Sequence, residues 1–346
     1  MDKRNPDGQV TGLRNRSWFM WLTMAAGMIL LALSMAASVV KGTVDIPVLT
    51  VWEAFADFNR ENSQHLIVTD LRLPRAIASA LVGAAFAVSG AIMQGVTRNP
   101  LADSGLMGLN AGAGFGLSIC FAFFPGLKYM QILFVSFLGA ALGASLVLGA
   151  ASLRRGGADS GRLVLAGAAV SALLTALSQG IALSFNVAQS VMFWTTGGTA
   201  GSDWQQVRLI CFWIISAVLC SFFLARPISL MSLGEDAARG LGVNTAAVCT
   251  MCSVLVLILA GTAVSVVGSV GFVGLIVPHL ARFLVGVDYR SILPVSAVFG
   301  ALLVVLADLG ARSLNPPFET PLGAVIALLG VPFFLYLARK QRRSRG

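Results

Sequence analysis

Charged side chains are scarce in this sequence: Asp, Glu, Lys and Arg make up only 11% of the 346 residues, whereas 57% are hydrophobic. A water-soluble domain normally carries about a quarter charged residues, so the surface of this chain is too apolar for water. Charge-free stretches such as 18–40 and 76–97 reach the length of about 20 residues that a helix needs to cross a bilayer. The sequence therefore predicts an all-α integral membrane protein with the lipid bilayer as its solvent.

Residues that catalysis would require are also missing. No Lys follows a Gly, so there is no Gly-Lys-Ser/Thr loop to hold ATP phosphates, and a partner would have to supply ATP hydrolysis. The only histidines are His65 and His279, with no acid or Cys at metal-ligand spacing and no Ser-His-acid pattern. We therefore predict no catalytic residue, no metal site and no bound cofactor. An intramembrane enzyme using His279 or Asp308 is the weakest alternative.

The net charge of +9 comes from short basic clusters between apolar stretches, which does not favour nucleic acid as a partner.

Dividing the chain at charges and turn residues predicts about ten transmembrane helices in a single domain over residues 1–346. Residues 240–281 contain no charged side chain and must fold back on themselves, with Gly268, Gly271 and Gly274 as the expected break. The expected spans are 17–40, 74–96, 105–124, 130–152, 162–185, 207–225, 246–266, 270–286, 292–312 and 321–338.

Basic residues are distributed unequally between the two sides of the predicted spans. An even number of spans places both termini on one side, and 17 of the 24 Lys and Arg residues then lie on that side. Short cytoplasmic loops of membrane proteins carry such an excess of positive charge. We therefore expect a cytoplasmic segment over residues 1–16, a basic cytoplasmic tail over 339–346, and Arg72, Arg75 and Arg312 on the outer side.

Three interruptions of the spans are candidates for function. At the start of the second span, Arg72 and Arg75 flank Pro74; they either snorkel to the interface or accept acidic groups of a docking protein, because Arg binds carboxylates bidentately. In the ninth span, Asp308 lies one helical turn before Arg312. We expect this to be a structural ion pair; the alternative is a proton relay in a secondary transporter.

The longest inner interruption spans residues 227–243. Leu233 and Gly234 precede an acidic start at Glu235 and Asp236, and Arg239 follows Glu235 at i+4. Gly240 and Gly242 are typical of a helix end. The pattern indicates a short helix parallel to the membrane, which either contacts a soluble motor subunit or is a plain surface turn.

Several of these segments together resemble one family, the FecCD permeases of type II ABC importers for iron-siderophores, haem and cobalamin. The resemblance rests on Leu-Arg-Leu-Pro-Arg at 71–75, Ser-Gly-Ala-Ile-Met-Gln at 89–94, Asn-Pro-Leu-Ala at 99–102, Met-Phe-Trp-Thr-Thr-Gly-Gly at 192–198, Gly-Phe-Val-Gly-Leu-Ile-Val-Pro-His-Leu-Ala-Arg at 271–282, and Pro-Leu-Gly at 321–323. It covers nearly the whole chain and implies the ten-helix permease fold, a bacterial cell membrane location and iron-siderophore cargo. Haem and cobalamin stay open as alternatives.

The resemblance also implies partners and roles. It implies a second permease subunit, identical or different, two ATPase subunits at the cytoplasmic face and an extracytoplasmic substrate-binding protein. Arg72, Arg75 and Arg312 would face acidic residues of the binding protein. The residues implied to couple to the ATPase are Leu233, Gly234, Glu235, Asp236, Arg239, Leu241 and Gly242. The fifth span would line the pathway and act as the gating helix, with Ala168, Ser171, Thr175 and Ser178 as the candidates.

Overall fold

The computed structural model describes residues 11–42, 45–152, 160–196, 198–315 and 318–343. All regular structure in these residues is helical, as expected from the sequence. The long or apolar helices are α1 (Thr11–Val40), α4 (Leu73–Thr97), α5 (Leu109–Phe123), α6 (Tyr129–Ser152), α7 (Ser160–Ser184), α9 (Trp204–Ser232), α11 (Thr245–Val256), α12 (Thr262–Val267), α13 (Val273–Val285), α14 (Tyr289–Ser313) and α15 (Leu322–Arg343). The shorter elements are α2 (Val48–Ala56), α3 (Ser63–Leu66), η1 (Ile67–Arg72), η2 (Ser104–Met107), α8 (Ala188–Thr196), α10 (Glu235–Gly240) and η3 (Leu257–Gly261).

In the described part of the chain, seven helical segments are long and apolar enough to cross a membrane. Three shorter apolar helices complete the set: α5, α13 and the apolar part of α15. Together they correspond to the ten predicted spans, and the all-α membrane fold is confirmed. One boundary was wrong. Helix α9 continues through Pro227 to Ser232, so the expected break after residue 225 is absent. The first span agrees with the prediction, since the apolar part of α1 is Trp18–Val40 and the helix itself begins at Thr11.

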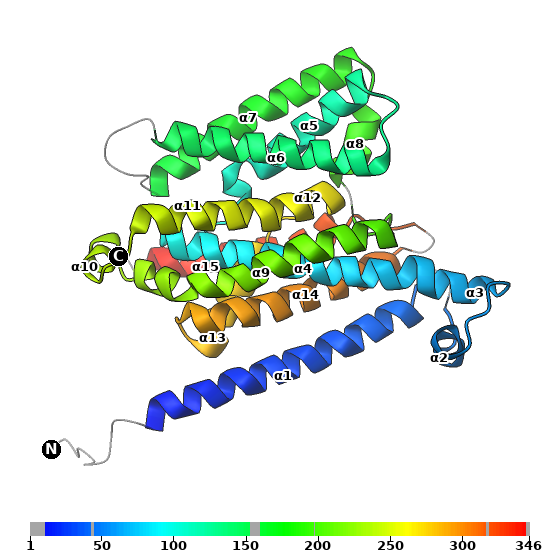
Figure 1. Cartoon of the computed structure of the whole chain (residues 1–346), viewed down its shortest axis with the longest axis horizontal. Coiled ribbons are helices and arrows are strands. Elements are labelled where there is room, and N and C mark those ends of the chain that lie inside the picture. Colours follow the sequence, from blue (N-terminus) through cyan, green and yellow to red (C-terminus); the bar gives the residue numbers. More distant parts are fainter. Residues whose placement is uncertain (1–10, 43–44, 153–159, 197, 316–317, 344–346) are drawn as a thin grey trace.

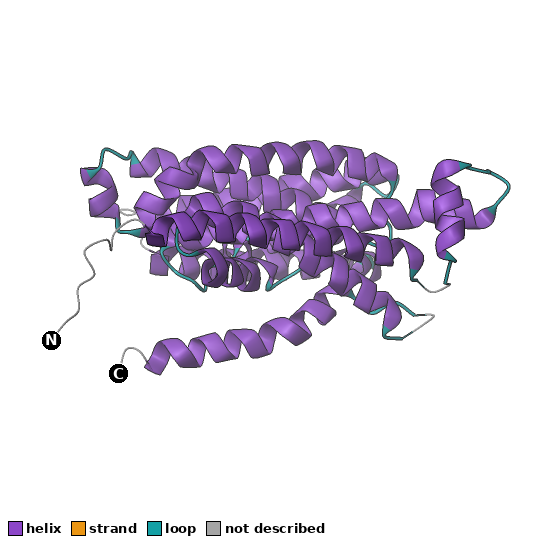
Figure 2. Ribbon diagram, turned by 90° about the horizontal axis from the view of Figure 1, so that it is seen from below, coloured by secondary structure: helices purple, strands orange, loops and turns teal. Residues whose placement is uncertain are grey.

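The helices run roughly parallel, which gives the molecule two distinct ends (Figure 1). One end carries α10, together with the start of α1 and the end of α15; we call it the α10 end. The opposite end carries α2 and α3, and we call it the arginine end because Arg72, Arg75 and Arg312 lie there. Figure 2 shows that α15 diverges from the other helices towards the α10 end.

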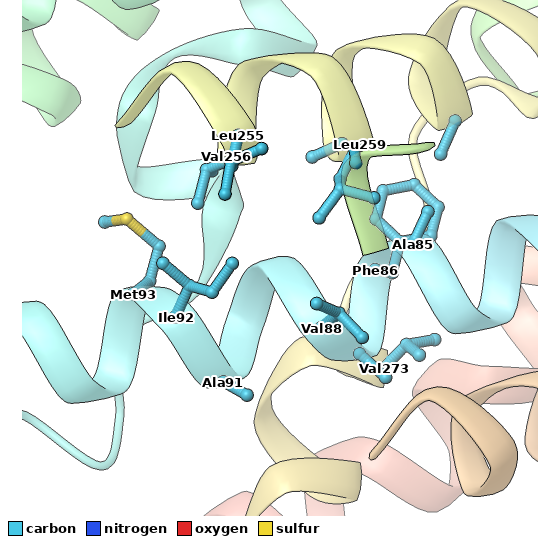
Figure 3. Close-up of a cluster of buried hydrophobic side chains, with 14 of the residues drawn as sticks. Ala85, Phe86, Val88, Ala91, Ile92, Met93, Leu255, Val256, Leu259 and Val273 are labelled. Carbon is cyan, nitrogen blue, oxygen red and sulfur yellow. The ribbon is translucent and has the colours of Figure 1, made fainter. Parts of the chain in front are cut away.

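The core is built around α4, which is the most buried of the candidate spans. Figure 3 shows Phe86 and Ile92 of α4 facing Val256 and Leu259 of the α11–η3 segment, while Val273 of α13 approaches α4 from the other side. Helices α5, α6, α7 and α8 form a second group beside this core (Figure 1). Helix α1 lies on the opposite flank.

Glycines allow the closest helix contacts. At Gly90 of α4, an added Cβ would overlap the backbone of Gly274 in α13, so no larger residue fits without moving one helix. Gly112 of α5 and Gly139 of α6 meet in the same way. Small residues of this kind let helix backbones pack directly in membranes, where apolar side chains gain little by leaving lipid.

The predicted break within residues 240–286 is found, with one correction. Helix α12 ends at Val267, Gly268 adopts a φ of 72°, and α13 begins at Val273. Gly274 does not belong to the break, because it lies inside α13 and packs on α4.

Asp103, in the connection between α4 and η2, lies beside Gly274 and accepts a 2.8 Å bond from the Ser104 N–H. Burial raises the pKa of the Asp103 carboxyl, and its bonds to Ser104 lower it in part.

Candidate functional site

Asp308 is the centre of a buried cluster of charged and polar groups at the arginine end. Arg75 of α4 donates from Nε at 3.0 Å and from Nη2 at 2.8 Å to Asp308 Oδ1. Arg312 Nη2 lies 3.2 Å from Asp308 Oδ2, so the i+4 pair expected from the sequence is present. The Thr199 hydroxyl donates to Asp308 Oδ1 at 2.7 Å, and Glu319 accepts from Arg75 Nη1 at 2.7 Å. We call these five residues the ionic cluster.

Arg72 and Arg312 join α1 to the core. Arg72 Nη1 donates to the carbonyl oxygens of Val39 and Val40 at 2.8 and 2.7 Å. Arg312 Nη2 donates to the Ser38 hydroxyl at 2.6 Å. Both contacts hold the last turn of α1, which has unsatisfied backbone carbonyls and favours nearby cations. The arginines therefore fasten three helices together at this end.

The burial of these arginines bears on their predicted role. Arg72, Arg75 and Arg312 are only 6%, 9% and 4% exposed. The snorkelling alternative is therefore wrong for Arg72 and Arg75, since both lie inside the protein. The docking role stays a prediction, but in this structure each guanidinium already has acceptors within the chain.

A cavity of about 540 Å³ adjoins the ionic cluster. Its lining includes Arg75, Asp308 and Glu319, together with Phe193 and Trp194 from α8. We call it the cluster cavity. It combines fixed charges with aromatic faces, a composition found in small-molecule sites.

A second cavity, of about 730 Å³, lies between α5, α7 and α8, and we call it the α7 cavity. Ser171, Thr175 and Ser178, three of the four residues predicted on the gating helix, line it. Ala168, the fourth, is not part of its lining. Met192 of α8 lines both cavities, so α8 lies between them.

Helix α7 is the least buried of the candidate spans in the described part of the chain, and it carries exposed polar side chains. Only 17% of its apolar span is buried, and Thr175 and Gln179, which line the α7 cavity, are exposed. Ser178 is an exception, since its hydroxyl donates to the Gly114 carbonyl of α5 at 3.1 Å. Exposed polar side chains on a spanning helix are costly in lipid and usually face protein or water. The α7 face with the cavity is therefore a candidate for a pathway or a subunit contact.

At the α10 end, the expected short helix is present as α10. Gly234, with a φ of 134°, precedes it, and α10 ends at Gly240, as the sequence indicated. Glu235 and Arg239 form the i+4 ion pair at 2.6 Å on the protein surface.

The residues around α10 differ in exposure. Leu233 and Leu241, which flank the helix, are 71% and 63% exposed, and Asp236 is exposed as well, whereas Ala238 faces inward. Gly242 follows with a φ of 82°. The segment offers two apolar side chains beside charged ones to a partner; its role in coupling stays a prediction.

Some residues of these sites carry no signal in the sequence. Thr199 and Glu319 meet Asp308 and Arg75 only through the fold, and neither belongs to a motif that predicts it. Asn110 and Gln179 of the α7 cavity are likewise single polar residues in apolar helices. Among the described residues, no group of three or more His, Cys, Asp and Glu could hold a metal ion, and the absence of a cofactor stays a prediction.

The profile of the FecCD transport family matches residues 14–340. The chain belongs to this family. It is 50% identical over 330 residues to the iron(3+)-hydroxamate import system permease protein FhuB of Bacillus subtilis (strain 168), covering 95% of this chain and 86% of that protein. It is also 40% identical to the Fe(3+)-citrate import system permease protein YfmD of the same organism, covering 91% and 92% of the two chains.

A solved structure supports the same assignment. An inward-facing metal-chelate type ABC transporter superposes with a TM-score of 0.80 at 28% identity, covering 93% of this chain and 99% of that one. Family and fold agree that the chain is a multi-pass membrane permease of the ABC importer type. It is a translocation subunit and works with further subunits.

Proposed function

We propose that this chain is the permease subunit of an ATP-driven importer that moves an iron-siderophore chelate into the bacterial cytoplasm. The observation that carries the proposal is the 50% identity, along almost the whole chain, with a permease for iron(3+)-hydroxamate. The further relatives named for iron-citrate and siderophore transport support iron chelates as the cargo class. Haem and cobalamin are therefore the less favoured cargoes.

The two cavities support a pathway for the cargo that opens to one side of the membrane at a time. The cluster cavity and the α7 cavity are separated by α8, so a shift of α8 against α7 would join or divide them. ATP binding can drive such a shift only if the motor contacts differ between the two states. In this proposal the permease supplies the path and its gates, and no residue of it reacts with the cargo.

The partners follow from the surfaces. A second permease subunit, identical or related, would cover the exposed polar face of α7. Two ATPase subunits would contact α10 through Leu233, Leu241 and the Glu235–Arg239 pair. A substrate-binding protein would dock at the arginine end, which the distribution of basic residues assigns to the outside.

A proton-coupled secondary transporter is not favoured by the surroundings of Asp308. Its oxygens already accept bonds from Arg75 and Thr199 and face Arg312. A transported proton would have to displace one of these donors and leave a buried guanidinium without its partner, which is costly. The cluster therefore suits a structural role.

The test is an uptake panel in bacterial cells that lack their own iron-chelate permeases. The chain is expressed with its ATPase and its binding protein, and uptake of radioactive iron is measured from a ferric hydroxamate, a ferric catecholate, ferric citrate and haem. We expect hydroxamate iron to be taken up fastest, and uptake to stop when the ATPase is omitted. Uptake of haem alone would contradict the cargo assignment.

A further inference from the structure

Helix α2 differs from the other helices in its direction. It lies at the arginine end and runs across the long axis of the bundle, seen end-on in Figure 1 and side-on in Figure 2. If the spanning helices stand roughly upright in the bilayer, α2 lies parallel to the membrane plane.

One side of α2 is an exposed apolar stripe. Val48, Leu49, Trp52 and Phe55 are 69%, 68%, 70% and 55% exposed. Because successive residues of a helix are rotated by about 100°, these positions share one face, at i, i+1, i+4 and i+7. No described residue of the chain covers this stripe, and four large apolar side chains together would be unfavourable in water.

The opposite side of α2 is fixed to the protein. Ala54 is buried in a small core with Ile46, with Val68 of η1 and with Val39 at the end of α1. Arg72 binds the carbonyls of Val39 and Val40 and so holds the point where the chain leaves α1 for α2. The stripe is thus presented on a supported helix, and its exposure follows from the way the helix is held.

The surroundings of the stripe indicate which partner it meets. Helix α1, which precedes α2, is only 22% buried over its apolar span and exposes large side chains such as Trp21, Ile29 and Leu33, so it presents the kind of apolar face that lipid covers. The stripe follows this lipid-facing helix after a short connection. The α7 cavity, where a second permease is proposed, belongs to the group of helices on the other flank of the core (Figure 1).

We propose that α2 is an interfacial helix that inserts its apolar stripe between the headgroups and acyl chains of the leaflet at the arginine end. Trp52 would be the anchor, since indole rings favour this layer of the bilayer. The charged residues of α2 and its C-cap, Glu53 and Asp57, are acidic and lie off the stripe, so the partner is an uncharged or zwitterionic lipid surface, bound by apolar contact rather than by charge. The helix thereby fixes the height of the α1–α4 junction relative to the membrane.

The test measures the depth of Trp52 in the full chain. The protein and its Trp52→Phe variant are placed in nanodiscs of phosphatidylcholine brominated either near the headgroup or near the end of the acyl chains. The fluorescence difference between the two proteins isolates Trp52 from the other tryptophans. Trp213→Phe is the matched control, because Trp213 is half exposed on α9 and lies about 14 Å along the helix from Trp204.

We expect shallow bromine to quench the Trp52 signal at least about twofold more strongly than deep bromine, and the order to reverse for Trp213. Salt should not change the Trp52 result. The proposal is overturned if bromine at either depth leaves Trp52 unquenched while aqueous iodide quenches it. It is also overturned if Trp52 becomes shielded only when the binding protein or a second permease is added, since a protein would then be the partner.

Discussion

Replacing Asp308 by Asn tests the role of the ionic cluster through protein stability. The substitution keeps the size of the side chain but removes the charge that faces Arg75 and Arg312, both of them buried. Removing one partner of a buried ion pair costs about 3–5 kcal/mol, because the remaining charge is left uncompensated. We therefore expect Asp308→Asn to lower the unfolding free energy by about 3 kcal/mol or more.

Glu319→Gln is the matched control. It removes the charge of the second carboxylate that pairs with Arg75. The Glu319 side chain is 34% exposed, so water can take over the lost interaction with the guanidinium. Exposed ion pairs contribute about 0–1 kcal/mol. At about 2.1 cal/mol/K of unfolding entropy per residue, a chain of 346 residues shifts its midpoint by roughly 1.4 °C per kcal/mol. Asp308→Asn should therefore lower the melting temperature by at least about 4 °C and Glu319→Gln by less than about 1.5 °C.

The melting temperature is measured in detergent with a dye that fluoresces on reacting with thiols. Cys120 and Cys252 are buried and react only after unfolding, while the exposed Cys220 gives the starting signal. The reasoning is refuted if Asp308→Asn melts within about 2 °C of the wild type, or if both variants lose the same stability.

Three further predictions concern packing, coupling and the pathway. Gly90→Leu should abolish the α4–α13 contact and reduce the yield of folded protein, whereas Gly149→Leu, where an added Cβ meets nothing, should not; size-exclusion chromatography compares them. Arg239→Glu should leave the melting temperature unchanged, because the residue is exposed, but reduce ATP-dependent uptake several-fold. Thr175→Trp should project an indole ring into the α7 cavity and obstruct uptake, whereas Leu173→Trp, exposed outside that cavity, should transport normally in the same assay.

Much of the fold could be predicted because a helix that crosses the bilayer needs about 20 predominantly apolar residues in a row. The spans were visible as long charge-free stretches, and the turn after α12 was visible at Gly268, where φ is positive. The short helix α10 was visible from its acidic start, its i+4 pair and its glycine end. In each case the signal lies within a few neighbouring residues.

The remaining features depend on distant residues. Arg75 and Glu319 are 244 positions apart, and nothing in the Leu-Arg-Leu-Pro-Arg motif reveals that its arginines are buried. An interruption was predicted from residue 227, but α9 continues through Pro227 to Ser232. Pro inside a membrane helix is more frequent than in soluble helices, so the residue alone does not mark a helix end. Which polar residues of α7 face a cavity depends on the position of α5 and α8, and the sequence of α7 alone does not fix this.

The central claim is that this permease imports an iron chelate only when an ATPase drives it. The most direct measurement places the chain in liposomes with its ATPase inside and its chelate-loaded binding protein outside, and follows iron entry. We predict entry with ATP and none with a proton gradient alone. Entry driven by the proton gradient without the ATPase would contradict the account.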